Sequence, residues 1–362
     1  MMRTKCCCRL FLSTIICALS ACSVDAPVLN PSPISPVEES RATLSPETNI
    51  GELEKIEVCY SVNTTVSLPL WYAYKNNLFQ KYGLDVDILS TGSGTSAATA
   101  MIAGEFPICQ LAGSAIINAV VAGEDLVYIA EYFNVYLFSL MVSPEIEKAE
   151  DLKGKALAIT QPGSANDTAI RAALRHLGLK PDIDVSILSI GDEPERLAAM
   201  EAGQVAGALF TAPTTLKLRE KGYWQLLDLS TIKDAYARQG VATTREYLRS
   251  HRTTVVAFMK AISEAIALMK KDSKGTKSIL AKYLFLDENT EAAALEAAYQ
   301  EIIIAYLRER PYPTLASIET GLMEIEPLNP GAASIEPEQV IDETILDELN
   351  ESGFFDSLYP SQ

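Results

Sequence analysis

Short apolar runs alternate with stretches of helical spacing from residue 55 onward, and this alternation constrains the fold of the 362-residue chain more than any other feature. The runs are nearly continuous in apolar residues, which is typical of strands covered by helices on both faces. A chain that alternates such strands with helices predicts a parallel, doubly wound α/β sheet. The first four runs are 56–60, 86–89, 106–111 and 127–130.

Glycine and proline mark the ends of the helices expected between these strands. Pro69 stands near the start of the first helix, and Gly83 lies just beyond its end. Proline is favoured at the first turn of a helix, and glycine is favoured just past the last one. Glycines also close the next two helices. The expected helices are 67–81, 95–103 and 114–122.

The same pattern starts afresh after residues 136–142 and a charged turn at 145–155. It therefore predicts two similar α/β lobes. The remainder, from about residue 245 to 308, is mostly helical, and its apolar residues recur at the spacing of a core-facing stripe. The expected elements of the second lobe are strands 156–160, 185–190 and 205–210 and helices 164–177 and 194–202.

The N-terminal residues have the pattern of an export signal. Three basic residues precede the apolar run 10–19, which is too short to span a bilayer, since a spanning helix needs roughly 20 residues. The run ends in Leu-Ser-Ala-Cys22, which resembles the bacterial lipobox, so we expect a signal peptide over 1–21 and a lipid on Cys22. The alternative is an ordinary signal peptide with a chance cysteine. Residues 22–50 are rich in proline and polar residues and predict a flexible linker.

Four of the seven cysteines lie in the predicted signal peptide, so they indicate no metal or redox site in the mature chain. Cys59 and Cys109 lie in predicted strands, where cysteine is commonly small and buried. An exported protein could oxidise this pair. Cysteines on parallel strands seldom meet disulfide geometry, however, and we expect two free thiols in the core.

The charge and the motifs exclude several classes of function. A net charge of −17 argues against nucleic acid as a partner, because phosphate binding needs a basic face. The two histidines, His176 and His251, stand beside arginines in helical stretches, and no catalytic or metal-binding motif occurs in the mature chain. The G-x-G-x-x-A pattern at 92–97 lacks the acidic residue that a dinucleotide site needs after the next strand. We expect no catalytic residues, no metal and no cofactor.

Ligands of open parallel sheets bind beyond the carboxyl ends of the strands, so the loops there are the candidate site. They are rich in glycine and hydroxyl residues, and most lead into a helix, whose N-terminus favours polar or anionic groups. For any one hydroxyl, helix capping is the alternative role, and Ser164 with Asp167 fits a capping box. The loops are 61–65, 91–95, 112–114, 131–134, 160–164, 191–193 and 211–213. The candidate ligand-binding residues are Asn63, Thr64, Trp71, Ser93, Gly94, Thr95, Gly113, Ser114, Glu131, Tyr132, Gln161, Gly163, Ser164 and Thr211.

These loops are compatible with two classes of ligand. An oxoanion would bind to helix N-termini and hydroxyls. A flat heterocycle would stack on Trp71, Tyr132 or Phe133 and use Glu131 as an acceptor. No arginine or lysine occurs in the seven loops, which disfavours a strongly charged anion.

Several short motifs follow one another in a specific order. They are Leu-Trp-Tyr-Ala at 70–73, the run 78–86, Gly-Ser-Gly at 92–94, Ala-Gly-Glu at 103–105, Asp-Leu-Lys-Gly-Lys at 151–155, Pro-Gly-Ser-Ala at 162–165, the run 201–205 and the run 241–246. With them, residues 55–270 resemble the periplasmic or lipid-anchored substrate-binding proteins of ABC importers for nitrate, sulfonate, taurine and thiamine-pyrimidine precursors. Two positions depart from that family, since Pro107 and Ala206 stand where an aspartate is usual.

The resemblance implies a two-lobed periplasmic-binding-protein type II fold, each lobe a doubly wound, mostly parallel sheet, joined by a hinge of crossing strands. We accordingly expect a first lobe at 51–137, a second at 138–240, a helical return to the first lobe at 241–330 and an acidic C-terminal extension at 331–362. From residue 311 onward the chain mixes prolines with short acidic amphipathic pieces, and this composition predicts a loosely packed tail.

For function, the resemblance implies a monomer outside the cytoplasm, anchored to the membrane by lipid, that closes on one small solute and presents it to an ABC permease. Two alternatives remain open. One is a ligand sensor that does not take part in transport. The other is a pyrimidine-precursor enzyme of the same fold, although the histidine and cysteine clusters of such enzymes do not occur in the mature sequence.

Overall fold

The computed structural model describes residues 52–360 of the chain. The predicted signal peptide, the lipidation site Cys22 and the linker 22–50 lie outside these residues. Among the residues described, no helix has both the length and the apolar character needed to cross a membrane.

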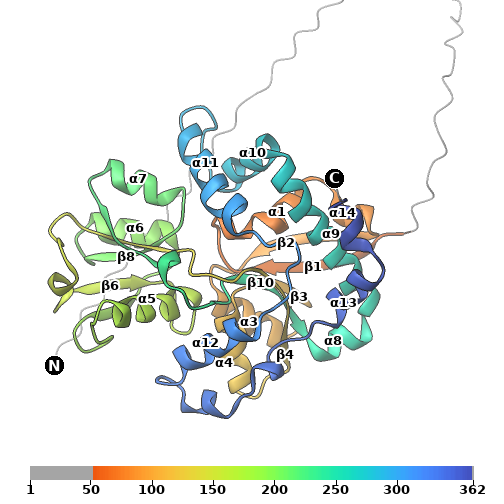
Figure 1. Cartoon of the computed structure of the whole chain (residues 1–362), viewed down its shortest axis with the longest axis horizontal. Coiled ribbons are helices and arrows are strands. Elements are labelled where there is room, and N and C mark those ends of the chain that lie inside the picture. The colour runs from red at the N-terminus through yellow and green to blue at the C-terminus, as the bar shows by residue number, and fades with distance from the viewer. Residues whose placement is uncertain (1–51, 361–362) are drawn as a thin grey trace, which may run out of the picture. The chain divides into compact units, whose positions relative to one another are not determined.

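Within residues 52–360 the strands form two five-stranded sheets (Figure 1). The first sheet has the order β2 (Leu84–Ser90), β1 (Glu54–Tyr60), β3 (Ile108–Leu111), β10 (Gln239–Thr244) and β4 (Leu126–Phe133). The second has the order β7 (Ser186–Ser189), β6 (Ala156–Ile159), β8 (Gly207–Phe210), β5 (Ser139–Val142) and β9 (Trp224–Asp228). We call each sheet with its covering helices a lobe. The prediction of two mostly parallel, doubly wound sheets is confirmed, and each sheet also contains one strand antiparallel to its neighbours, β10 in the first and β5 in the second.

The helices cover the sheets as the alternation predicts. Those of the second lobe are α5 (Ala165–His176), α6 (Glu193–Glu201) and α7 (Thr214–Glu220). Those of the first lobe are α1 (Leu68–Lys75), α2 (Leu78–Lys81), α3 (Gly94–Ile102), α4 (Gly113–Val121), α8 (Arg245–Ser250), α9 (Arg252–Lys271), α10 (Ser273–Tyr283), α11 (Ala292–Ala298), a π-helix at Tyr299–Ile304, α12 (Leu315–Ile325), α13 (Thr344–Glu351) and α14 (Phe354–Leu358). The single helix expected at 67–81 is divided, because Asn77 adopts a left-handed conformation with φ 56°.

Two crossing segments join the lobes, one from β4 to β5 and one from β9 to β10. They pair with each other: the backbone N–H of Tyr236 donates to the carbonyl of Asn134 (2.8 Å), and that of Arg238 donates to the carbonyl of Phe133 (3.0 Å). The rings of Tyr136 and Tyr236 stack with their centres 4.0 Å apart. The hinge is therefore a paired, ring-stacked element that places residue 238 between the lobes.

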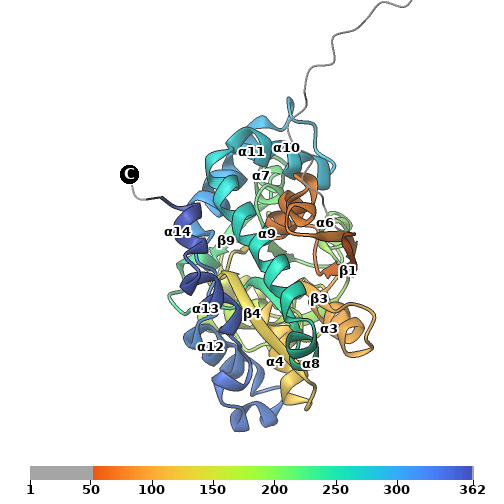
Figure 2. The ribbon, with the colours of Figure 1, turned by 90° about the vertical axis from the view of Figure 1, so that its right-hand side faces the viewer.

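The C-terminal residues pack tightly on the first lobe, so the expectation of a loosely packed extension is wrong. β4 is an edge strand, and residues near 340 supply partners for its backbone: Tyr128 N–H donates to Val340 O (2.8 Å), and Asp342 N–H donates to Tyr128 O (3.0 Å). Figure 2 shows α13 beside α9. The apolar face of the acidic segment fills the first lobe's core with Ile345, Leu346, Leu349 and Phe355.

Glu131 lies in strand β4, where it contacts the C-terminal part of the chain, and not in a loop. The prediction ended its strand at Ala130, but β4 continues to Phe133. The Glu131 carboxylate is buried, and its Oε2 accepts from Thr314 N–H (3.0 Å), Thr314 Oγ1 (3.0 Å) and Arg308 Nη1 (3.2 Å). Burial raises the pKa of Glu131 to about 7, against the opposing effects of Arg308 and Thr314.

Cys59 and Cys109 form a disulfide bond, so the expectation of two free thiols is wrong. The two residues are direct partners in the register between the parallel strands β1 and β3, with Cα atoms 4.5 Å apart. That separation lies within the range that a disulfide spans. The sequence indicates the two strands but not that they are neighbours in matching register, which is what brings the two sulfurs together.

Replacing both cysteines by alanine is expected to destabilise the protein. The bond closes a loop with a sequence separation of 50 residues, for which the entropic model gives about 4 kcal/mol. Denaturant unfolding of the oxidised protein and of the double variant Cys59→Ala, Cys109→Ala measures the difference. Equal stability of the two proteins would contradict the bond.

The raised pKa of Glu131 predicts that stability falls as the pH rises. Between about pH 4.5, its ordinary value, and about pH 7, the folded carboxyl retains a proton that the unfolded chain releases. Stability from this group is therefore full below 4.5 and is lost as the pH rises through 7, by an amount on the order of 3 kcal/mol. Glu131→Gln should remove that dependence. Parallel stability curves of wild type and variant between pH 5 and 8 would refute this prediction.

Candidate functional site

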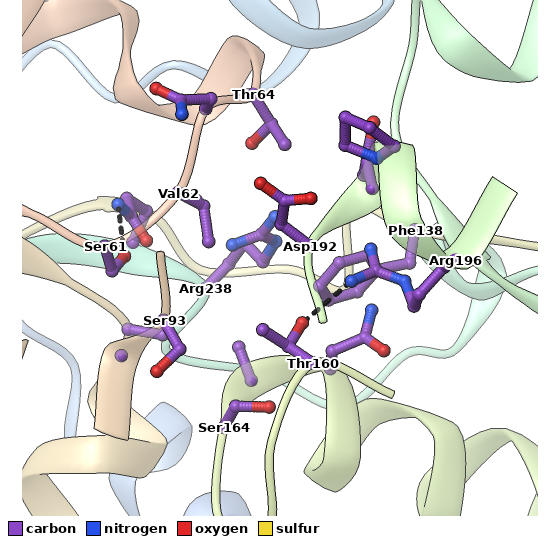
Figure 3. Close-up of a pocket in the computed structure, with 18 residues that line it drawn as sticks. Ser61, Val62, Thr64, Ser93, Phe138, Thr160, Ser164, Asp192, Arg196 and Arg238 are labelled. Carbon is purple, nitrogen blue, oxygen red and sulfur yellow. Dashed lines mark hydrogen bonds between the residues drawn. The ribbon is translucent and has the colours of Figure 1, made fainter. Parts of the chain in front are cut away.

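A pocket lies between the lobes, beyond the carboxyl ends of β1, β2 and β3 on one side and of β6 and β7 on the other (Figure 3). This is the position in which open α/β sheets bind ligands. The first lobe and the hinge contribute Ser61, Val62, Asn63, Thr64, Ser93, Gly94, Ala112, Phe138, Arg238 and Gln239. The second lobe contributes Thr160, Ser164, Ala165, Asn166, Asp192, Glu193, Pro194 and Arg196.

Three helices begin at the pocket, because their N-cap residues line it. Ser93 caps α3 by accepting from Ser96 N–H (3.0 Å), and Ser164 caps α5 by accepting from Asp167 N–H (3.4 Å). Asp192 is the N-cap of α6. Capping and pocket lining are thus combined in the same side chains, and the positive ends of three helix dipoles are directed at the pocket.

Arg238 is the charged residue that the hinge presents to the pocket. Its side chain is buried, and the guanidinium carbon lies 4.1 Å from the centre of the Phe138 ring. Within residues 52–360 its Nε has no hydrogen-bond partner, and no carboxylate lies within ion-pair distance of it. Burial lowers the pKa of Arg238 to about 10, so it is still protonated at neutral pH. The pocket therefore holds a positive charge without a contacting counter-charge.

A second buried arginine strengthens this potential. Arg196 Nη1 donates to Thr160 Oγ1 (2.8 Å) and to the carbonyl of Gly191 (2.7 Å), and Nη2 donates to the carbonyl of Leu209 (3.2 Å). All of these acceptors are uncharged. Burial lowers the pKa of Arg196. Arg196 thus fixes the loops after β6 and β7 while its charge adds to that of Arg238.

Two carboxylates stand near the arginines without contacting them. Glu193 accepts from Thr211 N–H (3.0 Å) and from Thr214 Oγ1 (2.8 Å), which directs its carboxylate toward the start of α7. Burial raises the pKa of Glu193. Asp192 also lines the pocket (Figure 3). The pocket is therefore lined by two arginines and two carboxylates, none of which form an ion pair with one another.

Several lining side chains have buried polar atoms without partners in the part of the chain that the structure describes. They are Thr64 Oγ1, both side-chain polar atoms of Asn166, and Gln239 Oε1. Buried polar atoms are normally hydrogen-bonded, and exceptions need an explanation. Their gathering around one pocket is typical of a site organised for a polar ligand.

The structure brings five of the predicted residues to the pocket, and three more connect the lobes. Ser93 Oγ donates to Gln161 Oε1 (2.8 Å), Thr95 Oγ1 donates to Pro162 O (3.1 Å), and Asn118 Nδ2 donates to Gly163 O (3.3 Å). Thr95, Gln161 and Gly163 therefore hold the lobes together at the rim. The five that line the pocket are Asn63, Thr64, Ser93, Gly94 and Ser164.

The other six predicted residues lie outside the pocket. Trp71 is fully buried in the first lobe, stacked on Tyr283 with ring centres 4.5 Å apart, so it is a core residue. Glu131 and Tyr132 are buried in β4, as described above. The arrangement thus offers neither Trp71 nor Tyr132 as a stacking platform for a heterocycle. The remaining three are Gly113 and Ser114, which are buried in α4, and Thr211, which lines a separate cavity.

The two arginines lie outside the loops that follow the strands, which are the segments that the sequence pattern indicates. Arg238 stands directly before β10, and β10 runs antiparallel to β3. The first residues of an antiparallel strand lie at the same edge as the last residues of its neighbours. Arg196 lies in the first turn of α6, just past its loop. The seven loops contain no basic residue, but the pocket has two arginines from other segments, so the absence of basic residues from the loops does not disfavour an anionic ligand.

Similar proteins agree with this architecture. A protein of Brachyspira hyodysenteriae named as an ABC transporter periplasmic binding protein is 22% identical over 276 residues, which cover 70% of this chain and 76% of that protein. A solved structure from Bordetella bronchiseptica has a TM-score of 0.71 at 21% identity, covering 83% of this chain and 98% of that one. The alkanesulfonate-binding protein of Xanthomonas axonopodis pv. citri, bound to MOPS, has a TM-score of 0.65 at 19% identity, covering 80% and 97%.

The family model described as NMT1/THI5 like matches residues 64–275, which include every strand of the two sheets except β1 and all the residues that line the pocket except Ser61, Val62 and Asn63. The match spans more than half of the chain. Together with the fold and the position of the pocket, it assigns the protein: the chain belongs to the NMT1/THI5-like family.

Proposed function

We propose that this protein is the solute-binding component of an ABC importer and that its solute carries an acidic group bound by Arg238. The observation that carries the proposal is the buried guanidinium of Arg238, which faces a pocket between two lobes without a carboxylate in contact. A buried charge without a partner costs several kcal/mol. In a chain of net charge −17, a buried arginine without a contacting carboxylate is a local and specific arrangement.

Binding would be coupled to closure of the lobes. The pocket takes residues from both lobes, and the crossing segments are the connections about which the lobes can rotate. A solute that contacts both sides stabilises the closed arrangement relative to an open one. The hydrogen bond from Thr65 Oγ1 to Ala212 O (2.6 Å) and the ion pair of Lys217 with Glu291 (2.6 Å) also link the lobes, so closure adds direct contacts to those of the solute.

The cellular setting follows from the sequence pattern at the N-terminus. We propose that the chain acts outside the cytoplasm as a monomer, held at the membrane by lipid on Cys22. The proline-rich residues 22–50 would allow the lobes to reach a permease in the same membrane. The name of the Brachyspira relative supports the assignment to an ABC transporter.

Arg238→Met is expected to weaken binding of the solute roughly 100-fold. The substitution removes both the hydrogen bonds that the guanidinium donates to the solute and the positive charge that balances the acidic group of the solute. The solute is first identified by native mass spectrometry of protein purified without refolding, and its affinity is then measured by calorimetry. Arg238→Lys keeps the charge but not the planar fork and should give an intermediate loss. Arg249→Met, at an exposed arginine of α8, is the matched control. A retained solute without an acidic group, or unchanged affinity in folded Arg238→Met, would overturn the proposal.

Gln161→Ala should weaken binding roughly 3- to 10-fold through faster dissociation, because it removes an acceptor that links the closed lobes and does not line the pocket. Stopped-flow dissociation rates test this, with Gln204→Ala at an exposed glutamine as the control. An unchanged dissociation rate would show that the rim contact has no part in closure.

A further inference from the structure

The unpartnered polar atoms of the pocket specify more of the solute than its acidic group. Asn166, Gln239 and Thr64 are each more than nine-tenths buried, and all three line the pocket. Within the described residues, Gln239 Oε1 and both polar atoms of the Asn166 amide have no partner. These side chains come from opposite sides, since Gln239 begins β10 of the first lobe and Asn166 lies in the first turn of α5.

The unpartnered atoms include two carbonyl oxygens that only a donor can satisfy. The Gln239 amide nitrogen faces Ser61 Oγ at 3.5 Å, which leaves Oε1 as the atom available to the pocket. Asn166 Oδ1 provides a second acceptor, and Asn166 Nδ2 provides a donor. Thr64 Oγ1 can donate or accept, so it does not discriminate between solutes.

A bare oxoanion would leave this acceptor set unsatisfied. Its oxygens could accept from Arg238 but could offer no hydrogen to Gln239 Oε1 or Asn166 Oδ1. Asp192, which also lines the pocket, favours positive or N–H groups on the solute (Figure 3). The polarity of the pocket thus matches a solute that has an acceptor end and a donor end.

Resting on the proposed function, we infer that the solute is a small acid that also carries an amino or amide N–H, and that Gln239 and Asn166 select for that group. Sites built to hydrogen-bond a polar group reject the analogue that lacks it, because their own buried atoms are then left unpaired. The donor-bearing acid should bind roughly 10-fold or more tightly than its parent acid.

Matched pairs of acids test this inference by calorimetry with the full mature protein. The probes are β-alanine against propionate, 2-aminoethanesulfonate against ethanesulfonate, and succinamate against butanoate. At least one donor-bearing acid should bind at least 10-fold more tightly than its partner. Gln239→Leu and Asn166→Leu should reduce that ratio toward one, while Gln204→Leu and Asn289→Leu, at exposed positions, should leave it unchanged.

The outcomes separate this inference from the proposed function. Equal affinity within every pair, with affinity still lost in Arg238→Met, overturns the inference and leaves the proposed function standing. Failure of every donor-bearing acid to bind also overturns it, and the solute retained from the cell then decides the proposed function. Thermal unfolding of each variant establishes that it is folded. If a leucine variant does not fold, Gln239→Met and Asn166→Ser replace it.

Discussion

A guanidinium that is buried without a contacting carboxylate is the constraint on which this site depends. Removing an ion from water costs several kcal/mol unless a partner compensates for it. Arg238 is partly compensated by the face of Phe138, which is an aromatic contact and leaves the edge of the guanidinium free. That edge is directed to a pocket whose other lining atoms include further unpartnered polar groups. A polar, acidic solute would supply the missing interactions all at once.

The position of Arg238 in the chain would connect the proposed solute binding to movement of the lobes. It lies at the end of one crossing segment, and its backbone N–H is bonded to the other through Phe133. Phe138 lies at the end of that other segment. The residue that would hold the solute is therefore part of the hinge, and the loops that face it belong to both lobes. Thr95, Gln161 and Gly163 then contribute by linking the closed lobes.

Much of the fold could be predicted because it depends on local patterns. Continuous apolar runs and helix punctuation identify β1 to β3, β6 to β8 and the helices between them. The sequence does not indicate which of the segments that are distant along the chain lie next to one another in the fold. The disulfide needs β1 and β3 side by side in register, the role of Glu131 needs residues 308–314 along β4, and the placement of Arg238 needs β10 to run antiparallel. Each of these depends on contacts between residues more than 45 positions apart.

The most direct test of the central claim is a crystal structure of the protein with its retained solute. We expect closed lobes and an acidic group of the solute within 3.2 Å of the Arg238 guanidinium, the usual upper limit for an N–H···O hydrogen bond. A solute bound elsewhere, or bound in this pocket with a cationic or apolar group against Arg238, would contradict it.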